Sequence, residues 1–165
     1  MFLIADHHDH QANRNLINVL AFYEQLINQK QPVAATQKFL RPDYIQHNPL
    51  IGTGAKALGE FFASVVSNRP YFRVEVHRII AANDYVWAHV NFTNLYTDEP
   101  GDLGVAGVDI YRFDGEGKVV EHWDTLQEVP APSGAANNNN KQIGGGGTRL
   151  ARWVGAAAPT PDLRC

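Results

Sequence analysis

The sequence predicts an α+β domain in which the helices come first and the strands follow. Between residues 13 and 68, apolar side chains recur at the spacing of an α-helix. Between residues 71 and 129 they alternate with polar side chains, which is the period of a strand with one buried face. Separate runs of helices and strands are typical of helices packed on one face of an antiparallel sheet. We therefore expect a curved antiparallel sheet closed on one side by helices, which gives a cone around a largely apolar pocket.

Helices are expected at residues 13–28, 32–40 and 55–68. The first starts at Asn13, a candidate N-cap, and presents one apolar stripe to the core. The second opens at Pro32, because a proline at the first helical position removes no helical hydrogen bond. The third presents another apolar stripe, so it should pack against the same sheet as the first.

Strands are expected at residues 72–80 and 85–96, and they are followed by a hairpin over residues 108–124. Two alternating runs flank the segment Asp-Gly-Glu-Gly at residues 114–117. The glycines of this segment can adopt the positive φ that a tight reversal needs. The hairpin is the part of the chain around which we expect the function to be organised.

The two faces of this hairpin differ in chemistry. If the reversal centres on Gly115 and Glu116, Asp109 lies opposite His122. One face then carries Asp109, Tyr111, Val120, His122 and Asp124. The other face carries Val108, Ile110, Arg112, Val119, Glu121 and Trp123. A bulge in the turn is the open alternative, since it would bring Glu121 and Trp123 to the first face.

Composition and charge narrow the classes of function. The chain has 165 residues, enough for one domain with a sizeable core. Its formal net charge of -3 gives no basic field, so we expect no nucleic-acid partner and no binding to a membrane surface. The single cysteine, Cys165, excludes an intramolecular disulfide and a cysteine zinc site. Without a signal peptide or a spanning stretch, a cytoplasmic location is expected.

The domain is expected to span residues 13–130. Residues 1–12 are predicted to be a flexible N-terminal arm whose three histidines are exposed to solvent. Residues 131–165 contain four consecutive asparagines and four consecutive glycines, so we predict a low-complexity tail outside the domain. The glycine run is not a phosphate-binding loop, because no Lys-Ser or Lys-Thr follows it.

Asp109, His122 and Asp124 are the candidate catalytic residues. Side chains on adjacent strands lie about 4.5–5.5 Å apart at Cβ, and diagonal ones about 7–8 Å, so all three can reach one small substrate. Two carboxylates and an imidazole on a face that a domain normally buries are costly unless they are paired or used in chemistry. The alternative is a solvated strand face with ordinary salt bridges.

Further residues are candidates for substrate binding. His47 and Asn48 lie in a polar and aromatic connector between two prolines, and such loops often rim a site. They could equally cap the following turn. Tyr44, Trp87 and Tyr111 offer flat surfaces for an aromatic or polyketide-like substrate, or serve in core packing.

Three segments resemble a known family. Residues 44–49 (Tyr-Ile-Gln-His-Asn-Pro), 108–113 (Val-Asp-Ile-Tyr-Arg-Phe) and 117–124 (Gly-Lys-Val-Val-Glu-His-Trp-Asp) look like the SnoaL-like polyketide cyclases, in particular their predicted aldol-condensation branch. The resemblance covers residues 13–129. It implies the cone-shaped nuclear transport factor 2-like fold, shared with ketosteroid isomerase, limonene-epoxide hydrolase and scytalone dehydratase. Fold does not fix function, and this superfamily includes non-enzymatic members.

The resemblance also implies a chemistry. SnoaL-like cyclases close a ring by intramolecular aldol chemistry without cofactor or metal, using an aspartate near the end of the last strand as acid and base. The matching residue is Asp124. Where the antibiotic cyclases place an assisting histidine, this chain has Asp109, with His122 beside it, so the identity of the assisting group is open. Gly107 stands where limonene-epoxide hydrolases carry an arginine, which argues against epoxide opening.

Removal of a proton α to a carbonyl needs a base and a donor for the enolate oxygen. Asp124 as the base, with His47 or His122 as the donor, would meet both needs. We therefore expect a small hydrophobic carbonyl-containing substrate and no cofactor.

Two other hypotheses stay open. His47, His122, Asp109 and Asp124 could form a metal site, although their spacing does not require one. The domain could instead be a non-enzymatic binding or dimerisation module. A homodimer is expected if Val108, Ile110 and Trp123 form an apolar stripe on the outer sheet face.

Overall fold

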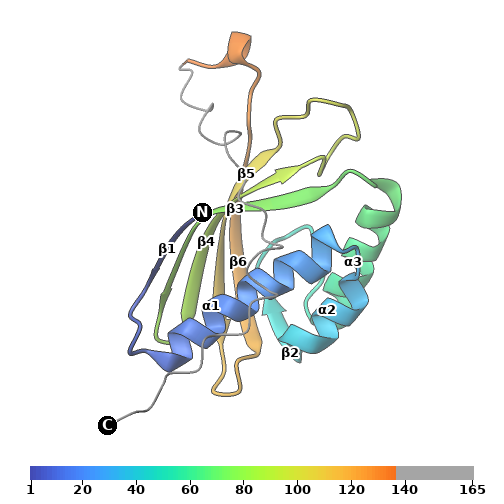
Figure 1. Cartoon of the computed structure of the whole chain (residues 1–165). Coiled ribbons are helices and arrows are strands. Elements are labelled where there is room, and N and C mark those ends of the chain that lie inside the picture. Colours follow the sequence, from blue (N-terminus) through green and yellow to red (C-terminus); the bar gives the residue numbers. More distant parts are fainter. Residues whose placement is uncertain (137–165) are drawn as a thin grey trace.

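A six-stranded sheet with helices on one of its faces makes up the computed structural model, which describes residues 1–136 (Figure 1). The strands lie in the order β1-β3-β4-β5-β6-β2. Their bounds are Phe2–Ala5 (β1), Leu40–Gln46 (β2), Arg73–Ala82 (β3), Tyr85–Thr93 (β4), Val105–Phe113 (β5) and Val119–Glu128 (β6). The predicted α+β class, with helices on one side of a curved sheet, is confirmed.

The helices of residues 1–136 are α1 (His10–Tyr23), α2 (Pro32–Phe39) and α3 (Ala55–Asn68), together with a short 3-10 helix, Pro132–Gly134. α1 continues into a π-helical segment, Glu24–Asn28. It begins earlier than predicted because Asp9, rather than Asn13, is its N-cap. The Asp9 carboxylate accepts a hydrogen bond from the backbone N–H of Ala12 at 2.9 Å.

The N-terminal residues do not form a loose arm. β1 pairs with β3 in parallel, with Phe2 opposite Arg78, and His10 already begins α1. The prediction of a flexible arm over residues 1–12 is therefore wrong. The partner strand lies far downstream in the chain, so periodicity within these few residues gives no sign of the pairing.

The first part of the connector predicted over residues 43–49 belongs in fact to strand β2. This strand pairs in parallel with β6, with Leu40 opposite Val119 and Gln46 opposite His122. The sheet is therefore mixed rather than wholly antiparallel: β3 to β6 are antiparallel, and the parallel strands β1 and β2 lie at its two edges. The pairing of β2 with β6 brings Gln46 next to His122.

The reversal of the hairpin is wider than the sequence suggested. Its first residue, Asp114, accepts the backbone N–H groups of Glu116 and Lys118 on its Oδ1 atom, both at 2.9 Å. Gly117 completes the turn at a φ of 82°, a conformation that favours glycine.

This turn changes the predicted pairing of the two strands. Asp109 lies opposite Asp124, and not opposite His122 as predicted. The register shifts near the turn, so that Val119 is buried where Val120 was expected. Beyond this irregularity, each residue of β5 pairs with a residue of β6 two positions further along than predicted. A shift by two residues leaves every side chain on the same face, so Asp109, His122 and Asp124 keep the common face that alternation predicted.

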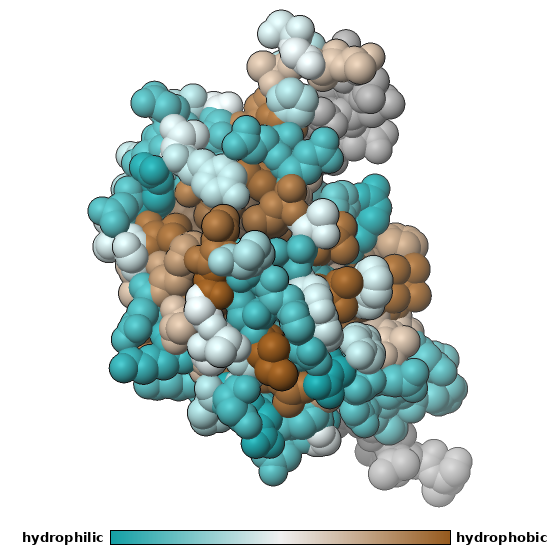
Figure 2. All heavy atoms as spheres, turned by 180° about the vertical axis from the view of Figure 1, so that it is seen from behind, coloured by the Kyte–Doolittle hydropathy of each residue, from teal (hydrophilic) through white to brown (hydrophobic). Residues whose placement is uncertain are grey.

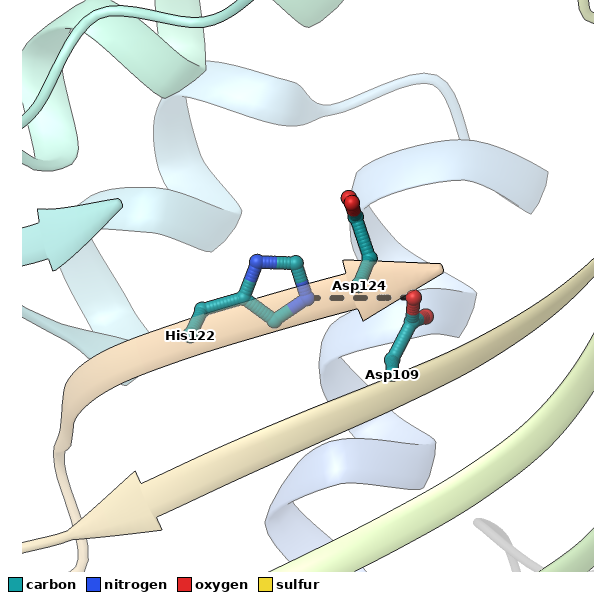
Figure 3. Close-up of side chains that lie close together, drawn as sticks. All are labelled: Asp109, His122 and Asp124. Atoms are coloured by element: carbon teal, nitrogen blue, oxygen red, sulfur yellow. Dashed lines mark ion pairs between the residues drawn. The ribbon is translucent and has the colours of Figure 1, made fainter. Parts of the chain in front are cut away.

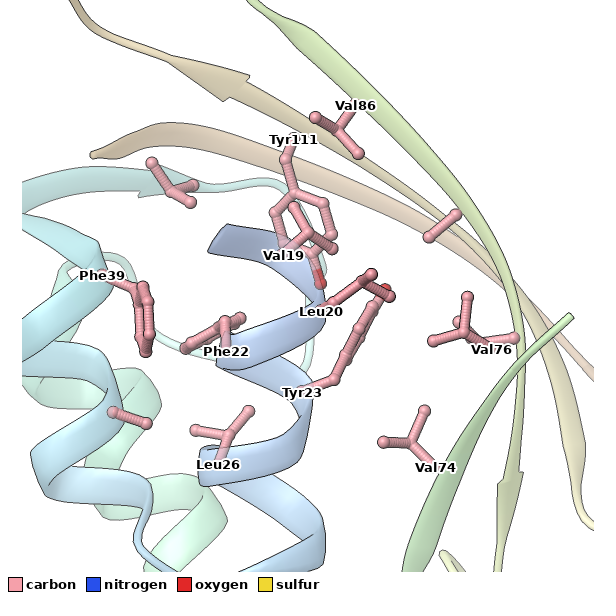
Figure 4. Packing of buried hydrophobic residues seen from close by; sticks show 14 of the residues in the cluster. Val19, Leu20, Phe22, Tyr23, Leu26, Phe39, Val74, Val76, Val86 and Tyr111 are labelled. Atoms are coloured by element: carbon pink, nitrogen blue, oxygen red, sulfur yellow. The ribbon is translucent and has the colours of Figure 1, made fainter. Parts of the chain in front are cut away.

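The inner face of the sheet packs against α1, as Figure 4 shows. The apolar side chains at this interface come from the predicted stripe of α1 and from alternate positions of the strands. They include Leu16, Val19, Leu20, Tyr23, Val74 and Val76. α2 and α3 pack against each other at one end of this layer (Figure 1).

Other predictions about organisation stay predictions. Residues 131–136 are the start of the predicted tail, and the rest of that tail, with Cys165, lies outside the described residues. No helix of residues 1–136 is long and apolar enough to cross a membrane. The cytoplasmic location remains a prediction.

Candidate active site

A pocket lies between the helices and the inner face of the sheet. Its empty space, including the part open to solvent, is about 780 Å³. Most of its wall is apolar and aromatic, with contributions from Phe61, Phe62, Phe72, Phe92, Leu95 and Leu126. Leu50 and Tyr96 also line it and are exposed to solvent, so they mark its mouth. Such an apolar chamber with a few convergent polar groups is the usual form of a small-molecule site.

Asp109, His122 and Asp124 supply polar groups to this pocket (Figure 3). Asp109 comes from β5, and the other two residues come from β6. They share a face because alternate residues of a strand point to the same side. The Nε2 atom of His122 lies 3.8 Å from Oδ1 of Asp109. One ligand atom from each of the three residues lies within 4.8 Å of the others.

Asp109 is held by tyrosines. It is only 3% exposed, and its Oδ2 atom accepts a hydrogen bond from the Tyr23 hydroxyl of α1. The Tyr111 hydroxyl lies 3.5 Å from the same oxygen. Burial, followed by the charge of Asp109, raises the pKa of Tyr23 and of Tyr111 well above the usual value. Both phenols therefore keep their protons near neutral pH and can act as donors.

His122 is fixed by a side chain from the edge strand β2. Its Nδ1 atom lies 2.9 Å from Oε1 of Gln46. Its Nε2 atom is buried and has no hydrogen-bond partner among residues 1–136. The imidazole therefore has one anchored nitrogen and one unpartnered nitrogen, and the unpartnered one faces Asp109.

Asp124 is held by one amide. The Nδ2 atom of Asn48 lies 3.0 Å from Oδ1 and 2.8 Å from Oδ2 of Asp124. The Asn48 amide is oriented from its other side, because its Oδ1 accepts the backbone N–H of Leu50 at 2.9 Å. Nearby, the pKa of Tyr44 is raised by burial and then by the charge of Asp124.

The charge in the pocket is unbalanced. Among the described residues that line it, none is lysine or arginine. Arg112, which could have neutralised an aspartate, binds Glu121 instead, at 2.7 Å from Nη2 to Oε2. His122 is therefore the only lining side chain in residues 1–136 that can take a positive charge beside the two carboxylates. Two carboxylates beside one imidazole in an apolar chamber make this a candidate site for proton transfer.

The same three side chains could also approach a metal ion. A zinc ion with ligands at 2.0–2.1 Å would hold them about 3.3 Å apart, which is closer than the present set. Asn48 donates hydrogen bonds to both oxygens of Asp124, and His47, the fourth predicted ligand, lies outside the pocket. Metal binding would therefore require these side chains to rearrange.

Sequence comparison identifies the family. The family model described as SnoaL-like domain matches residues 19–122, more than half of the chain. The chain belongs to the SnoaL-like domain family. A protein named "Probable cyclase otaY" from Aspergillus carbonarius is 32% identical over 99 residues, which cover 58% of this chain and 74% of that protein. The protein of the same name from Aspergillus niger is 28% identical over 112 residues, covering 66% and 87%.

Solved structures share the fold of this SnoaL-like chain at low sequence identity. A "Putative polyketide cyclase" from Bacillus cereus matches with a TM-score of 0.64 and 18% identity, over 76% of this chain and 83% of the other. An "ntf2-like protein of unknown function" from Mesorhizobium loti matches with a TM-score of 0.56 and 15% identity, over 77% and 99%. These likenesses show the fold alone, and they confirm the expected nuclear transport factor 2-like architecture.

Six of the predicted site residues line the pocket of the SnoaL-like domain: Asp109, His122, Asp124, Tyr44, Asn48 and Tyr111. Two predictions of position are wrong. His47 follows Gln46 along the chain and points to the opposite side, where it lies 2.8 Å from Glu121 and stacks on Trp123 at 4.6 Å. Trp87 is 50% exposed on the outer sheet face. Neither side chain lines this pocket.

Two residues of the SnoaL-like site, Tyr23 and Gln46, were not predicted from the sequence. Tyr23 belongs to the apolar stripe of the first helix, yet its hydroxyl reaches Asp109. A tyrosine in a buried stripe is a usable signal, because its hydroxyl must find a partner. Gln46 lies inside the resembling segment, but its role depends on the pairing of β2 with β6 and could not be inferred locally.

Proposed function

We propose that the chain is a cofactor-independent acid/base enzyme that performs aldol cyclisation or isomerisation of a small, hydrophobic, polyketide-like carbonyl compound. The observation that carries this proposal is the convergence of Asp109, His122 and Asp124 in an apolar pocket without lysine or arginine among its described lining residues. The name of the Aspergillus relatives as cyclases supports the type of reaction.

In the proposed reaction Asp124 removes the proton α to a carbonyl. The C–H bond breaks, and its electron pair forms an enolate whose oxygen accepts a hydrogen bond from protonated Nε2 of His122. Asp109 stabilises that imidazolium from 3.8 Å. In a cyclisation the enolate carbon then bonds to a second carbonyl carbon, and the proton on Asp124 passes to the new alkoxide. In an isomerisation the same proton returns to a different carbon. No oxidant or other co-reactant is needed.

The test is a screen of β-keto esters and polyketide-type substrates with the wild type, Asp124→Asn and Asp109→Asn. Each positioned acid or base is typically worth about 10²–10⁴-fold, so both variants should lose that much turnover. Glu128→Gln is the control, because Glu128 is an exposed carboxylate on the same strand as Asp124. Turnover that survives both pocket substitutions would contradict the enzymatic proposal and leave a binding module.

We also propose that the outer sheet face joins two copies of the chain. A cross-strand row of apolar side chains runs over five strands of this face: Ile4, Ile80, Trp87, Ile110 and Trp123. Figure 2 views the molecule from behind, opposite α1, and shows hydrophobic patches between hydrophilic side chains. Ile4, Ile80 and Trp87 of this row are exposed to solvent, which favours an association surface. Light scattering should give the mass of a dimer for the wild type and of a monomer for Trp87→Lys, and a monomeric wild type would contradict the proposal.

A further inference from the structure

The side-chain amide of Gln46 connects three parts of the pocket. Its Oε1 atom lies 3.0 Å from the backbone nitrogen of Asn48 and 2.9 Å from Nδ1 of His122. Its Nε2 atom lies 2.6 Å from the hydroxyl oxygen of Tyr44. Gln46 lines the pocket, and its position on β2 next to His122 follows from the parallel pairing with β6.

The backbone N–H of Asn48 fixes the direction of these hydrogen bonds. A backbone N–H can only donate, so the Gln46 atom that faces Asn48 must be the carbonyl oxygen. The same oxygen faces Nδ1 of His122, and an oxygen of this kind can only accept. Nδ1 must therefore carry a hydrogen. In the neutral imidazole, Nε2 is then the nitrogen with the free lone pair.

The location of Nε2 agrees with this assignment. It is buried, it has no hydrogen-bond partner among residues 1–136, and its neighbour is the Asp109 carboxylate at 3.8 Å. A proton that arrives on Nε2 creates an imidazolium beside that carboxylate. A proton that leaves Nε2 returns the ring to the neutral form that Gln46 holds. Nδ1 stays protonated in both states.

The other end of the Gln46 amide orients Tyr44. Because the amide NH₂ group donates to the Tyr44 oxygen, the hydrogen of the Tyr44 hydroxyl must point away from Gln46. Tyr44 lines the pocket, and burial and the charge of Asp124 raise its pKa, so this hydroxyl keeps its proton. It is therefore free to donate to a substrate oxygen or to Asp124.

We propose that Gln46 is a positioning residue that sets the tautomer of His122. It keeps a hydrogen on Nδ1, so that Nε2 is the nitrogen that takes up a proton and donates the hydrogen bond to the enolate oxygen. The same amide turns the Tyr44 hydroxyl into a second donor for the substrate oxygen. This inference rests on the proposed function for its catalytic consequence. The tautomer itself can be measured without any substrate.

The experiment is nitrogen-15 NMR of the histidine side chains, in which the two ring nitrogens report which of them carries the proton. His122→Asn assigns the signals. Gln46→Met removes both the acceptor and the donor at similar side-chain length, whereas Gln46→Glu retains an acceptor for Nδ1. Gln127→Met is the matched control, since Gln127 is an exposed glutamine on β6. Thermal melting of each variant checks that it is folded.

We expect the neutral ring of His122 to carry its hydrogen on Nδ1 in the wild type, Gln46→Glu and Gln127→Met. Gln46→Met should shift His122 toward the Nε2–H form, which can approach Asp109, and should lower kcat at least tenfold with a smaller change in KM. A wild type in the Nε2–H form, or a folded Gln46→Met with an unchanged tautomer, would overturn the inference. A chain with the expected tautomers that turns over no carbonyl substrate would instead overturn the proposed function.

Discussion

The two faces of the β5–β6 hairpin use the same kinds of side chain for different purposes. On the outer face, Glu121 binds both His47, at 2.8 Å, and Arg112, at 2.7 Å. Hydrogen bonds from His47 and then from Arg112 lower the pKa of Glu121, so its charge is compensated by side chains of the same face. On the inner face, Asp109 and His122 are at least nine-tenths buried and are not hydrogen-bonded to each other. A compensated cluster stabilises a surface, whereas an uncompensated one is available for chemistry.

The largest expected effect is on turnover, when the histidine of the inner face is substituted and compared with the histidine of the outer face. His122→Gln should reduce turnover by about 10²–10⁴-fold, because the proton donor at the enolate oxygen is lost. His47→Gln should leave turnover nearly unchanged, because His47 lies outside the pocket. Steady-state kinetics on any substrate found in the screen would measure both variants. Equal losses from the two substitutions would break the distinction between the faces.

A smaller effect is expected on stability when the Tyr23 hydroxyl, which donates to Asp109, is removed. Tyr23→Phe removes the buried hydroxyl that donates a hydrogen bond to the Asp109 carboxylate. A buried acceptor that loses its donor costs about 1–3 kcal/mol of stability. The free energy of unfolding in urea should fall by that amount. Tyr85→Phe, at an exposed position on β4, should change it little. If Tyr23→Phe were as stable as the wild type, Asp109 would not depend on its tyrosine.

The outer histidines of β3 and β4 predict a loss of stability in mild acid. The rings of His77 and His89 lie 5.6 Å apart, and Nη1 of Arg78 lies 2.9 Å from His89. Burial lowers the pKa of both histidines. At His89 the charges of His77 and then of Arg78 lower the pKa further, and at His77 the charge of Glu75 opposes the effects of burial and of Arg78.

The sign of this effect follows from proton binding. Below about pH 6.5 the unfolded chain takes up protons that the folded histidines resist, so the free energy of unfolding falls as the pH drops toward the folded pKa. Above that pH these two residues contribute no pH dependence. Denaturant titrations between pH 5 and 8 should show a steeper acid loss for the wild type than for a variant with His77→Gln and His89→Gln. Parallel curves would contradict the prediction.

The smallest effect is expected at the compensated cluster itself. Glu121→Gln breaks partly exposed ion pairs with His47 and Arg112, and such pairs are typically worth about 1 kcal/mol or less. The melting temperature should therefore fall slightly, while turnover stays the same. A large loss of turnover would show that the outer face communicates with the pocket.

Local sequence determined which side chains share a face. Helical spacing located the apolar stripe of α1 and α3, and alternation placed Asp109, His122 and Asp124 on one side of a hairpin. These features depend only on the geometry of a single strand or helix, in which the side-chain period is fixed. For the same reason, alternation from Gln46 could have placed His47 outside, had β2 been recognised as a strand.

Only the tertiary structure decided which of these residues meet. The register that puts Asp109 opposite Asp124 depends on a wide turn and an irregularity near Val120. The contact of Tyr23 with Asp109 joins a helix to a strand. The contact of Gln46 with His122 joins β2 to β6, which lie far apart in the chain. Pairings between distant segments are selected by the packing of the whole core, so no local pattern of residues records them.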